Sequence, residues 1–206
     1  MKTIETTLTT QAVFSKDESK RYLLKKTWDT SLPKLTICML APSIASGIEL
    51  DSTTSLVLNN ASALGFGSVS IVNLFATLGD FSLSEAEDED PENLDAIIEA
   101  VKAADVVIYA PGVGKAKLQA FQERSNQVLD ALRPFQAKLR CLTSASGKAR
   151  LLHPLCPAVR TWHISELPLE ELLPTTDSVE PKSTPKKKGK PMVIKKEAST
   201  TATSLP

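Results

Sequence analysis

The chain has 206 residues, of which 42% are hydrophobic, and it carries 24 acidic and 24 basic residues. This length accommodates one globular domain with tails, and no apolar run reaches the roughly 20 residues that a membrane-spanning helix needs. The N-terminal residues contain no apolar core of the kind that marks a secretory signal, so we expect a cytoplasmic protein that does not associate with membranes.

The neutral net charge hides two regions of opposite sign. Residues 174–206 carry seven Lys against Asp177, Glu180 and Glu197, so the rest of the chain is mildly acidic. A mildly acidic body is not typical of a domain that grips duplex DNA. Because residues 174–206 are rich in Pro, Lys, Ser and Thr, we predict a disordered basic tail. Its lysines from Lys182 to Lys196 either contact a polyanion or are only solvated.

Strand and helix patterns alternate through the rest of the chain. Two short segments around the polar turn KDES predict an antiparallel hairpin, and the later apolar runs predict buried strands between amphipathic helices. The predicted strands are Gln11–Ser15, Arg21–Trp28, Leu35–Leu40, Ser68–Leu74, Asp105–Tyr109 and Lys138–Thr143, and the predicted helices are Ser52–Leu64, Glu92–Ala103 and Lys115–Leu132.

This alternation is typical of an α/β fold. We predict a three-layer α/β/α sandwich whose short, mainly parallel sheet has four strands, with the hairpin added at the N-terminal side. The expected domain covers residues 11–173 and follows a tail at residues 1–10. The acidic run SEAEDEDPE, Ser84 to Glu92, is predicted to be an exposed loop rather than a metal site.

Polar residues gather where the predicted parallel strands end. In open α/β sheets, ligands bind in the crevice beyond these carboxyl ends. We therefore predict a pocket there, with His153 and Asp51 as candidate catalytic residues. The candidate ligand-binding residues are Pro42, Ser43, Thr53, Asn73, Phe75, Lys115 and Arg150.

Each of the main candidates also has a purely structural interpretation. Asp51 or Ser52 caps the helix that follows, with or without a role in the site. Asn73 either ties down a neighbouring loop or contacts a ligand. His153 is either a satisfied structural imidazole or a group for acid–base chemistry or anion recognition. The sequence PGVGK at 111–115 lacks the GxxxxGK[ST] pattern of a phosphate-binding loop, and its glycines are consistent with a turn.

The sequence indicates no metal and no cofactor. Its three cysteines, Cys38, Cys141 and Cys156, are too widely spaced for a disulfide framework or a zinc site. Cys38 and Cys141 fall in predicted strands, where a small buried thiol is expected. Cys156 follows the only HPL triplet and is the one thiol near the predicted site.

The succession of motifs resembles a known family. RYLLKKTW, LTICMLAPSIAS, ELDSTT, VSIVNLFAT and GKARLLHPL follow one another over about Val13 to Leu155. In this order they are similar to the family called domain of unknown function 1643. Ala41 and Ser46 stand where that family has Asn and Asp, and YAPGVG replaces a Trp-Gly element. The resemblance therefore implies a member with altered specificity or lost activity. The retained positions are Pro42, Ser43, Asp51, Thr53, Asn73, Leu74, Phe75, His153, Pro154 and Leu155.

The layout is also similar, more faintly, to uracil-DNA glycosylase-like proteins, because LAPS and HPL stand in positions corresponding to their motifs. This similarity implies a flipped base held by Asn73 and Phe75, with His153 stabilising negative charge. Two functions follow. The first is a non-catalytic or altered-specificity ligand-binding or accessory protein, and the second is an enzyme that processes nucleobases or nucleic acid. The expected ligand is a nucleotide or single-stranded nucleic acid.

Overall fold

The computed structural model describes residues 1–43, 47–79, 90–115, 117–148 and 150–173. The chain divides into Met1–Pro174 and Thr175–Pro206, and every described residue belongs to the first part. The predicted tail at 174–206 and most of the acidic run from Ser84 therefore lie outside the described residues. Within the described ranges, no helix combines the length and the apolar character needed to cross a membrane.

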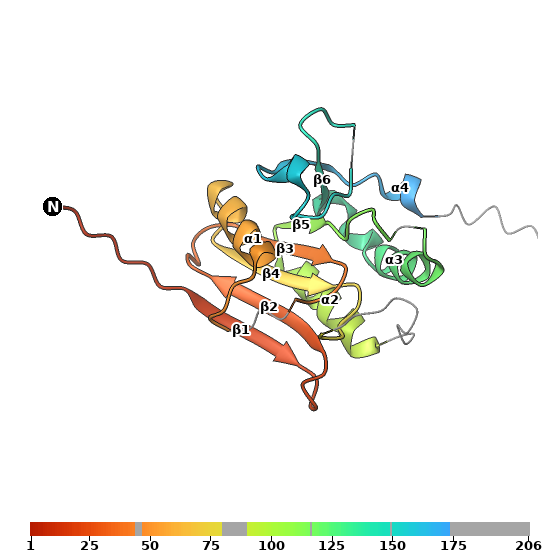
Figure 1. The fold of residues 1–206 in the computed structure, drawn as a ribbon, viewed down its shortest axis with the longest axis horizontal. Coiled ribbons are helices and arrows are strands. Elements are labelled where there is room, and N and C mark those ends of the chain that lie inside the picture. Colours follow the sequence, from red (N-terminus) through yellow and green to blue (C-terminus); the bar gives the residue numbers. More distant parts are fainter. Residues whose placement is uncertain (44–46, 80–89, 116, 149, 174–206) are drawn as a thin grey trace, which may run out of the picture. The chain divides into compact units, whose positions relative to one another are not determined.

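A mixed sheet of seven strands carries the fold (Figure 1). The strand order is β1-β2-β4-β3-β5-β6-β7; the four strands β4, β3, β5 and β6 run parallel, while β1, β2 and β7 are antiparallel to their neighbours. The strands are β1 (Thr9–Phe14), β2 (Arg21–Thr27), β3 (Lys34–Met39), β4 (Ser68–Asn73), β5 (Val106–Tyr109), β6 (Leu139–Thr143) and β7 (His163–Glu166).

The α/β prediction is confirmed, but the prediction of a four-stranded sheet is wrong. The hairpin β1–β2 extends the same sheet, because β2 pairs with β4 in a register that aligns Leu24 with Ile71. At the other edge β7 pairs with β6 and aligns Ile164 with Leu142. The sequence pattern does not predict β7, because its four residues HISE contain one apolar side chain and give no alternation to recognise.

Three helices lie close to their predicted positions: α1 (Ser52–Ala63), α2 (Pro91–Ala103) and α3 (Gln119–Ala131). The sequence pattern does not predict the short helix α4 (Leu169–Leu172) or the 3-10 turns η1 (Arg133–Lys138) and η2 (Pro157–Val159). The helix α3 begins four residues after the predicted Lys115, because residues 115–118 form a turn that the Leu118 N–H closes on the Lys115 carbonyl at 3.0 Å.

The helices cover both faces of the sheet. Val57 and Ala61 of α1 pack against Ile37 and Ile71 in one apolar cluster. On the other face, α2 and α3 contribute to a second cluster with Val72, Val107 and Cys141. The chain moves from β3 to β4 in one direction and then returns across β3 to β5, so right-handed crossovers place α1 opposite α2 and α3. Each fully buried aliphatic side chain contributes about 1.5–3 kcal/mol.

Candidate functional site

Two neighbouring strands send the chain to opposite faces of the sheet. β3 and β5 pair in parallel, yet β3 continues to α1 on one face and β5 continues to α3 on the other. Ligands of open α/β sheets bind outside the carboxyl ends of the strands at such a switch point. The residues that follow β3, β4 and β5 are therefore the ones whose side chains matter most for binding.

The connection from β3 to α1 contains Pro42, Ser43 and Asp51. Pro42 is buried, whereas Ser43, Asp51 and Thr53 are half-buried. Asp51 is the N-cap of α1: its Oδ1 accepts the Thr54 backbone N–H at 2.6 Å. The predicted capping role is therefore present, and Asp51 rather than Ser52 fills it. Of the lost family positions, Ala41 is half-buried, and Ser46 lies outside the described residues.

The carboxylate of Asp51 is held in its ionised form. Burial raises the pKa of Asp51, but hydrogen bonds from Ser43 and Thr54 and the charge of Arg21 outweigh burial, so its pKa lies below the usual value. A carboxylate that accepts several hydrogen bonds is a weak base. Asp51 is therefore suited to orient neighbouring groups rather than to remove a proton.

Arg21 joins this site, and the sequence pattern alone does not reveal it. Arg21 begins β2 and is only 2% exposed. Its guanidinium donates to the Ser43 carbonyl at 3.1 Å and interacts electrostatically with Asp51. Burial lowers the pKa of Arg21, and the Asp51 carboxylate opposes this effect. The available signal is the RY pair that opens the strand RYLLKKT.

Asn73 ends β4 beside β3. The parallel register aligns Asn73 with Met39, so its side chain faces the α1 side of the sheet, where Met39 packs. Asn73 is 1% exposed, and its Nδ2 has no hydrogen-bond partner among the described residues. Asn93 Oδ1 and Trp162 Nε1 share this lack within the same residues, but Asn73 alone of the three stands at a parallel strand end on the α1 side.

His153 lies in the segment after β6, near enough to Asp51 for the two groups to interact electrostatically. It is half-buried, and its Nδ1 accepts the Leu155 backbone N–H at 3.2 Å. Burial lowers the pKa of His153, while the nearby Asp51 carboxylate raises it, and the balance is a pKa below the usual value. The ring is therefore neutral near pH 7, and because Nδ1 accepts, its hydrogen is on Nε2.

Gly112, which follows β5, packs closely against His153. A Cβ atom on Gly112 would lie 3.1 Å from the His153 Cβ, and the φ of Gly112 is +81°. Both the contact and the left-handed backbone favour glycine. The glycines of PGVGK thus serve a turn, as the structural interpretation predicts, and the turn brings β5 against His153. We call Arg21, Ser43, Asp51, Asn73 and His153 the strand-end cluster.

Three predicted residues lie apart from this cluster. Phe75 packs against the apolar cluster on the α2 and α3 side, so it does not share a face with the Asn73 side chain. Lys115 is exposed in the turn before α3. Arg150 is also exposed, and its guanidinium lies 3.8 Å from the Glu171 carboxylate.

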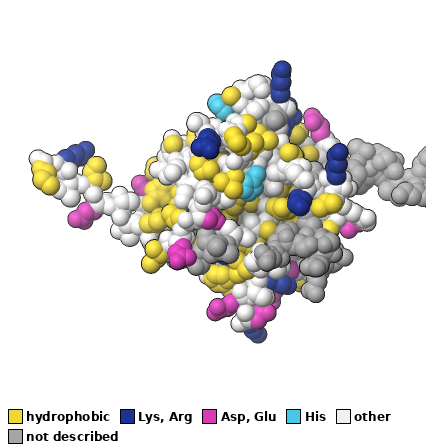
Figure 2. Space-filling view, viewed as in Figure 1, with side chains coloured by type: hydrophobic (Ala, Val, Ile, Leu, Met, Phe, Trp, Pro, Cys, Tyr) yellow, Lys and Arg dark blue, Asp and Glu magenta, His cyan; other side chains and the backbone are white. Residues whose placement is uncertain are grey.

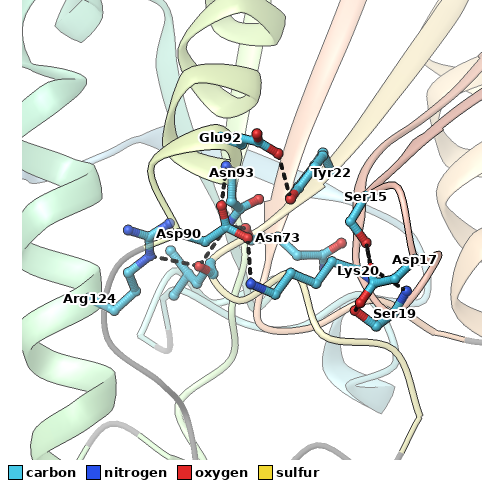
Figure 3. A network of polar contacts seen from close by, with 11 residues as sticks. Ser15, Asp17, Ser19, Lys20, Tyr22, Asn73, Asp90, Glu92, Asn93 and Arg124 are labelled. Atoms are coloured by element: carbon cyan, nitrogen blue, oxygen red, sulfur yellow. Dashed lines mark hydrogen bonds and ion pairs between the residues drawn. The ribbon is translucent and has the colours of Figure 1, made fainter.

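A second polar group lies on the α2 side of β4, as Figure 3 shows. Asn93 Nδ2 donates to the carbonyls of Asn73 and Leu74, each at 3.1 Å, and Arg124 Nε donates to the Leu74 carbonyl at 2.8 Å. Asp90 caps α2 through the Asn93 N–H and pairs with Lys20 at 3.0 Å. This α2 network (Lys20, Tyr22, Asp90, Glu92, Asn93 and Arg124) fixes the backbone that carries Asn73.

Tyr22 adds a further link to the α2 network. Its hydroxyl donates to Glu92 at 3.0 Å. Burial, followed by the nearby carboxylates of Glu92 and Asp90, raises the pKa of Tyr22, so the hydroxyl stays protonated. The hairpin is thereby tied to the first turn of α2.

Hydrophobic side chains gather over the middle of the face that Figure 2 shows, and one histidine lies among them. The described residues contain no group of three His, Cys, Asp or Glu side chains that could hold a metal ion. Burial raises the pKa of the Cys38 thiol to about 12, so this thiol is inert.

A shallow hollow lies where β6 begins, at the opposite end of that strand from the strand-end cluster. It is lined by Gln136, Ala137, Leu139, Arg140, Glu166 and Leu167.

Comparisons with known proteins give one family. No curated protein and no solved structure matches the chain. A family model described as "Protein of unknown function (DUF1643)" matches residues 21–155, which contain every member of the strand-end cluster. The chain therefore belongs to the DUF1643 family.

Proposed function

We propose that the protein binds a ligand at the carboxyl ends of its parallel strands and is a non-catalytic or altered-specificity binding or accessory protein. The observation that carries this proposal is the buried Nδ2 of Asn73, which has no partner among the described residues. A buried donor without a partner costs about 1–3 kcal/mol, and native proteins retain few such groups. A ligand that offers a hydrogen-bond acceptor would remove this cost.

The charges of the strand-end cluster favour an uncharged ligand group. Arg21 already donates to Ser43 and faces Asp51, so its positive charge is balanced within the protein. Asn73 and the neutral His153 add donors without charge. A carbonyl group, such as a nucleobase presents, suits these donors better than a phosphate does. We therefore propose that a nucleotide or a single-stranded nucleic acid would be recognised through its base.

The same geometry makes acid–base catalysis a poorer description. Asp51 is engaged by Ser43 and Thr54 and has a lowered pKa. His153 uses Nδ1 to hold the Leu155 N–H, so only its Nε2–H is directed elsewhere. Asp51 is therefore a weak base, and the lone pair of His153 is already used within the protein, whereas a general base needs a free lone pair within reach of the proton. The replacement of the family's Asn and Asp by Ala41 and Ser46 supports the same conclusion.

One observation favours a second candidate, an enzyme that processes nucleobases or nucleic acid in the manner of uracil-DNA glycosylase-like hydrolases. A neutral imidazole that donates from Nε2 can stabilise negative charge as it develops on a leaving base. This role needs no titration of His153. The analogy of fold alone does not carry the function.

Two further parts of the proposal rest on composition alone. We propose a cytoplasmic location, and we propose that the lysines from Lys182 to Lys196 contact a polyanion. Seven Lys within residues 174–206 support the second statement.

Thermal unfolding of the full chain tests the proposed function. Nucleobases, nucleosides, nucleotides and short single-stranded oligonucleotides are added in turn, and a ligand at 100 times its Kd should stabilise by about 2.7 kcal/mol. We expect the shift to disappear in Asn73→Ala and His153→Ala but to remain in Asn59→Ala, which changes an exposed asparagine of α1. Absence of a shift with every ligand would contradict the proposal, and release of a free base from an oligonucleotide would favour the enzyme.

A further inference from the structure

The outer edge of β1 has no partner strand among the described residues. β1 occupies one end of the sheet and pairs with β2 alone among the described strands. In an antiparallel strand, every second residue directs its backbone N–H and C=O away from the paired neighbour, so β1 presents a row of donors and acceptors. Figure 1 shows that the residues before β1 lead away from the sheet and do not fold back over this edge.

The sequence of this edge lacks the usual protection. Residues 6–14, TTLTTQAVF, include no charged residue and no proline, and Leu8, Val13 and Phe14 are 47%, 38% and 36% exposed. Edge strands of monomeric proteins are commonly shortened or given charges or prolines to prevent pairing. The opposite edge follows that practice: β7 has only four residues, ends in Glu166 and is followed by Pro168. The two edges of one sheet thus differ in how freely they can pair.

We infer that β1 pairs with β1 of a second copy of this chain and forms a two-fold symmetric, antiparallel dimer with a continuous sheet. An antiparallel strand pair is complementary to itself by symmetry, so the same surface serves both subunits. Centred on Gln11, this arrangement pairs residues 8–14 of one copy with residues 8–14 of the other in the opposite direction, and this stretch carries no charged residue.

Three exposed side chains of β1 make the interface testable. Thr9, Gln11 and Val13 alternate along β1 and are all exposed, so they share the outer surface. In the antiparallel dimer they lie opposite the same residues of the partner, around the two-fold axis. One variant carries Thr9→Lys, Gln11→Lys and Val13→Lys, and a second carries Glu at the same three positions. Like charges directly opposite each other on paired strands are destabilising.

Analytical ultracentrifugation of the full chain over a range of concentrations gives the measurement. We expect a reversible dimer for the unaltered protein, a dimer Kd raised at least about tenfold in each charged variant, and restored dimerisation when the two variants are mixed. Glu166→Lys on the opposite edge should leave the Kd unchanged, and equal melting temperatures of the dilute variants would show that the fold is kept. A monomer at every concentration, or charged variants that dimerise as before, would overturn the inference.

Discussion

Asn73 and Asn93 are both buried, each with 1% of its surface exposed, and they stand on opposite sides of one strand end. Asn93 belongs to the α2 network, where its Nδ2 makes two hydrogen bonds to the backbone. The Nδ2 of Asn73 makes none within the described residues. The Asn93 side chain therefore stabilises the fold, whereas the Nδ2 of Asn73 contributes no hydrogen bond to it within the described residues.

The largest expected effect belongs to Asn93→Leu. This change removes one donor from the carbonyl of Asn73 and one from the carbonyl of Leu74. It also removes Asn93 Oδ1, which has no partner among the described residues, so we expect a net loss of about 1–3 kcal/mol in the free energy of unfolding. Urea denaturation followed by circular dichroism measures it. Asn59→Ala, at an exposed asparagine of α1, is the control, and equal losses in the two variants would remove the distinction between buried and exposed amides.

Asn73→Leu should act in the opposite direction. Replacing an amide that has no partner with an apolar side chain of similar shape removes its desolvation cost, so we expect the free energy of unfolding to rise by about 1–2 kcal/mol. A stabilising change at a polar position is typical of residues kept for function. The same denaturation experiment serves here. A loss comparable to that of Asn93→Leu would show that Asn73 supports the fold, and the ligand proposal would then lose its main support.

The sequence predicts the position of Asn73 better than it predicts the hydrogen bonds of Asn93. The apolar runs of β3, β4, β5 and β6 and the turn residues between them predict the parallel strands and hence the edge where Asn73 lies. They do not predict that Asn93 reaches back to that edge, because the contact joins residues 20 positions apart through packing of α2 on the sheet. Local patterns carry no information on such a pairing.

Arg21 and Phe75 show where reasoning from the sequence stops. A cation beside a hairpin turn is expected to be solvated, yet Arg21 is buried because the connection from β3 places Ser43 and Asp51 against it. Phe75 follows Asn73 by two positions, which suggests a shared face. The strand ends at Asn73, however, and the next residues turn to the α2 and α3 side. Both outcomes depend on tertiary contacts rather than on spacing.

Asp51→Ala tests the other main member of the strand-end cluster. Loss of the N-cap of α1, and of the carboxylate that faces the buried Arg21, should lower the free energy of unfolding by at least about 1 kcal/mol at pH 7. The folded-state pKa of Asp51 lies below the unfolded value of 3.8, so its carboxylate contributes stability above that value, and this contribution is lost as the pH falls through the folded pKa. The variant should therefore lose less stability than the unaltered protein between neutral pH and the acid limb.

Denaturation midpoints at a series of pH values check this prediction, with Asp95→Ala as a control at an exposed carboxylate of α2. A parallel pH dependence in Asp51→Ala and the unaltered protein would mean that the folded state does not hold Asp51 in its ionised form. The interpretation of Asp51 as an orienting carboxylate would then fail, while its capping role would still be measured at pH 7.

Arg150→Ala should have the smallest effect, although the sequence places Arg150 among the ligand-binding candidates. Its side chain is 50% exposed, and its guanidinium is 3.8 Å from a Glu171 carboxylate that is 76% exposed, an arrangement worth less than about 0.5 kcal/mol. We expect an unchanged melting temperature and, for any ligand that Asn73→Ala abolishes, an unchanged thermal shift. A lost shift in Arg150→Ala would extend the binding surface beyond the strand-end cluster. It would also indicate that the ligand carries a negative charge, because a solvated guanidinium gains most from binding an anionic group.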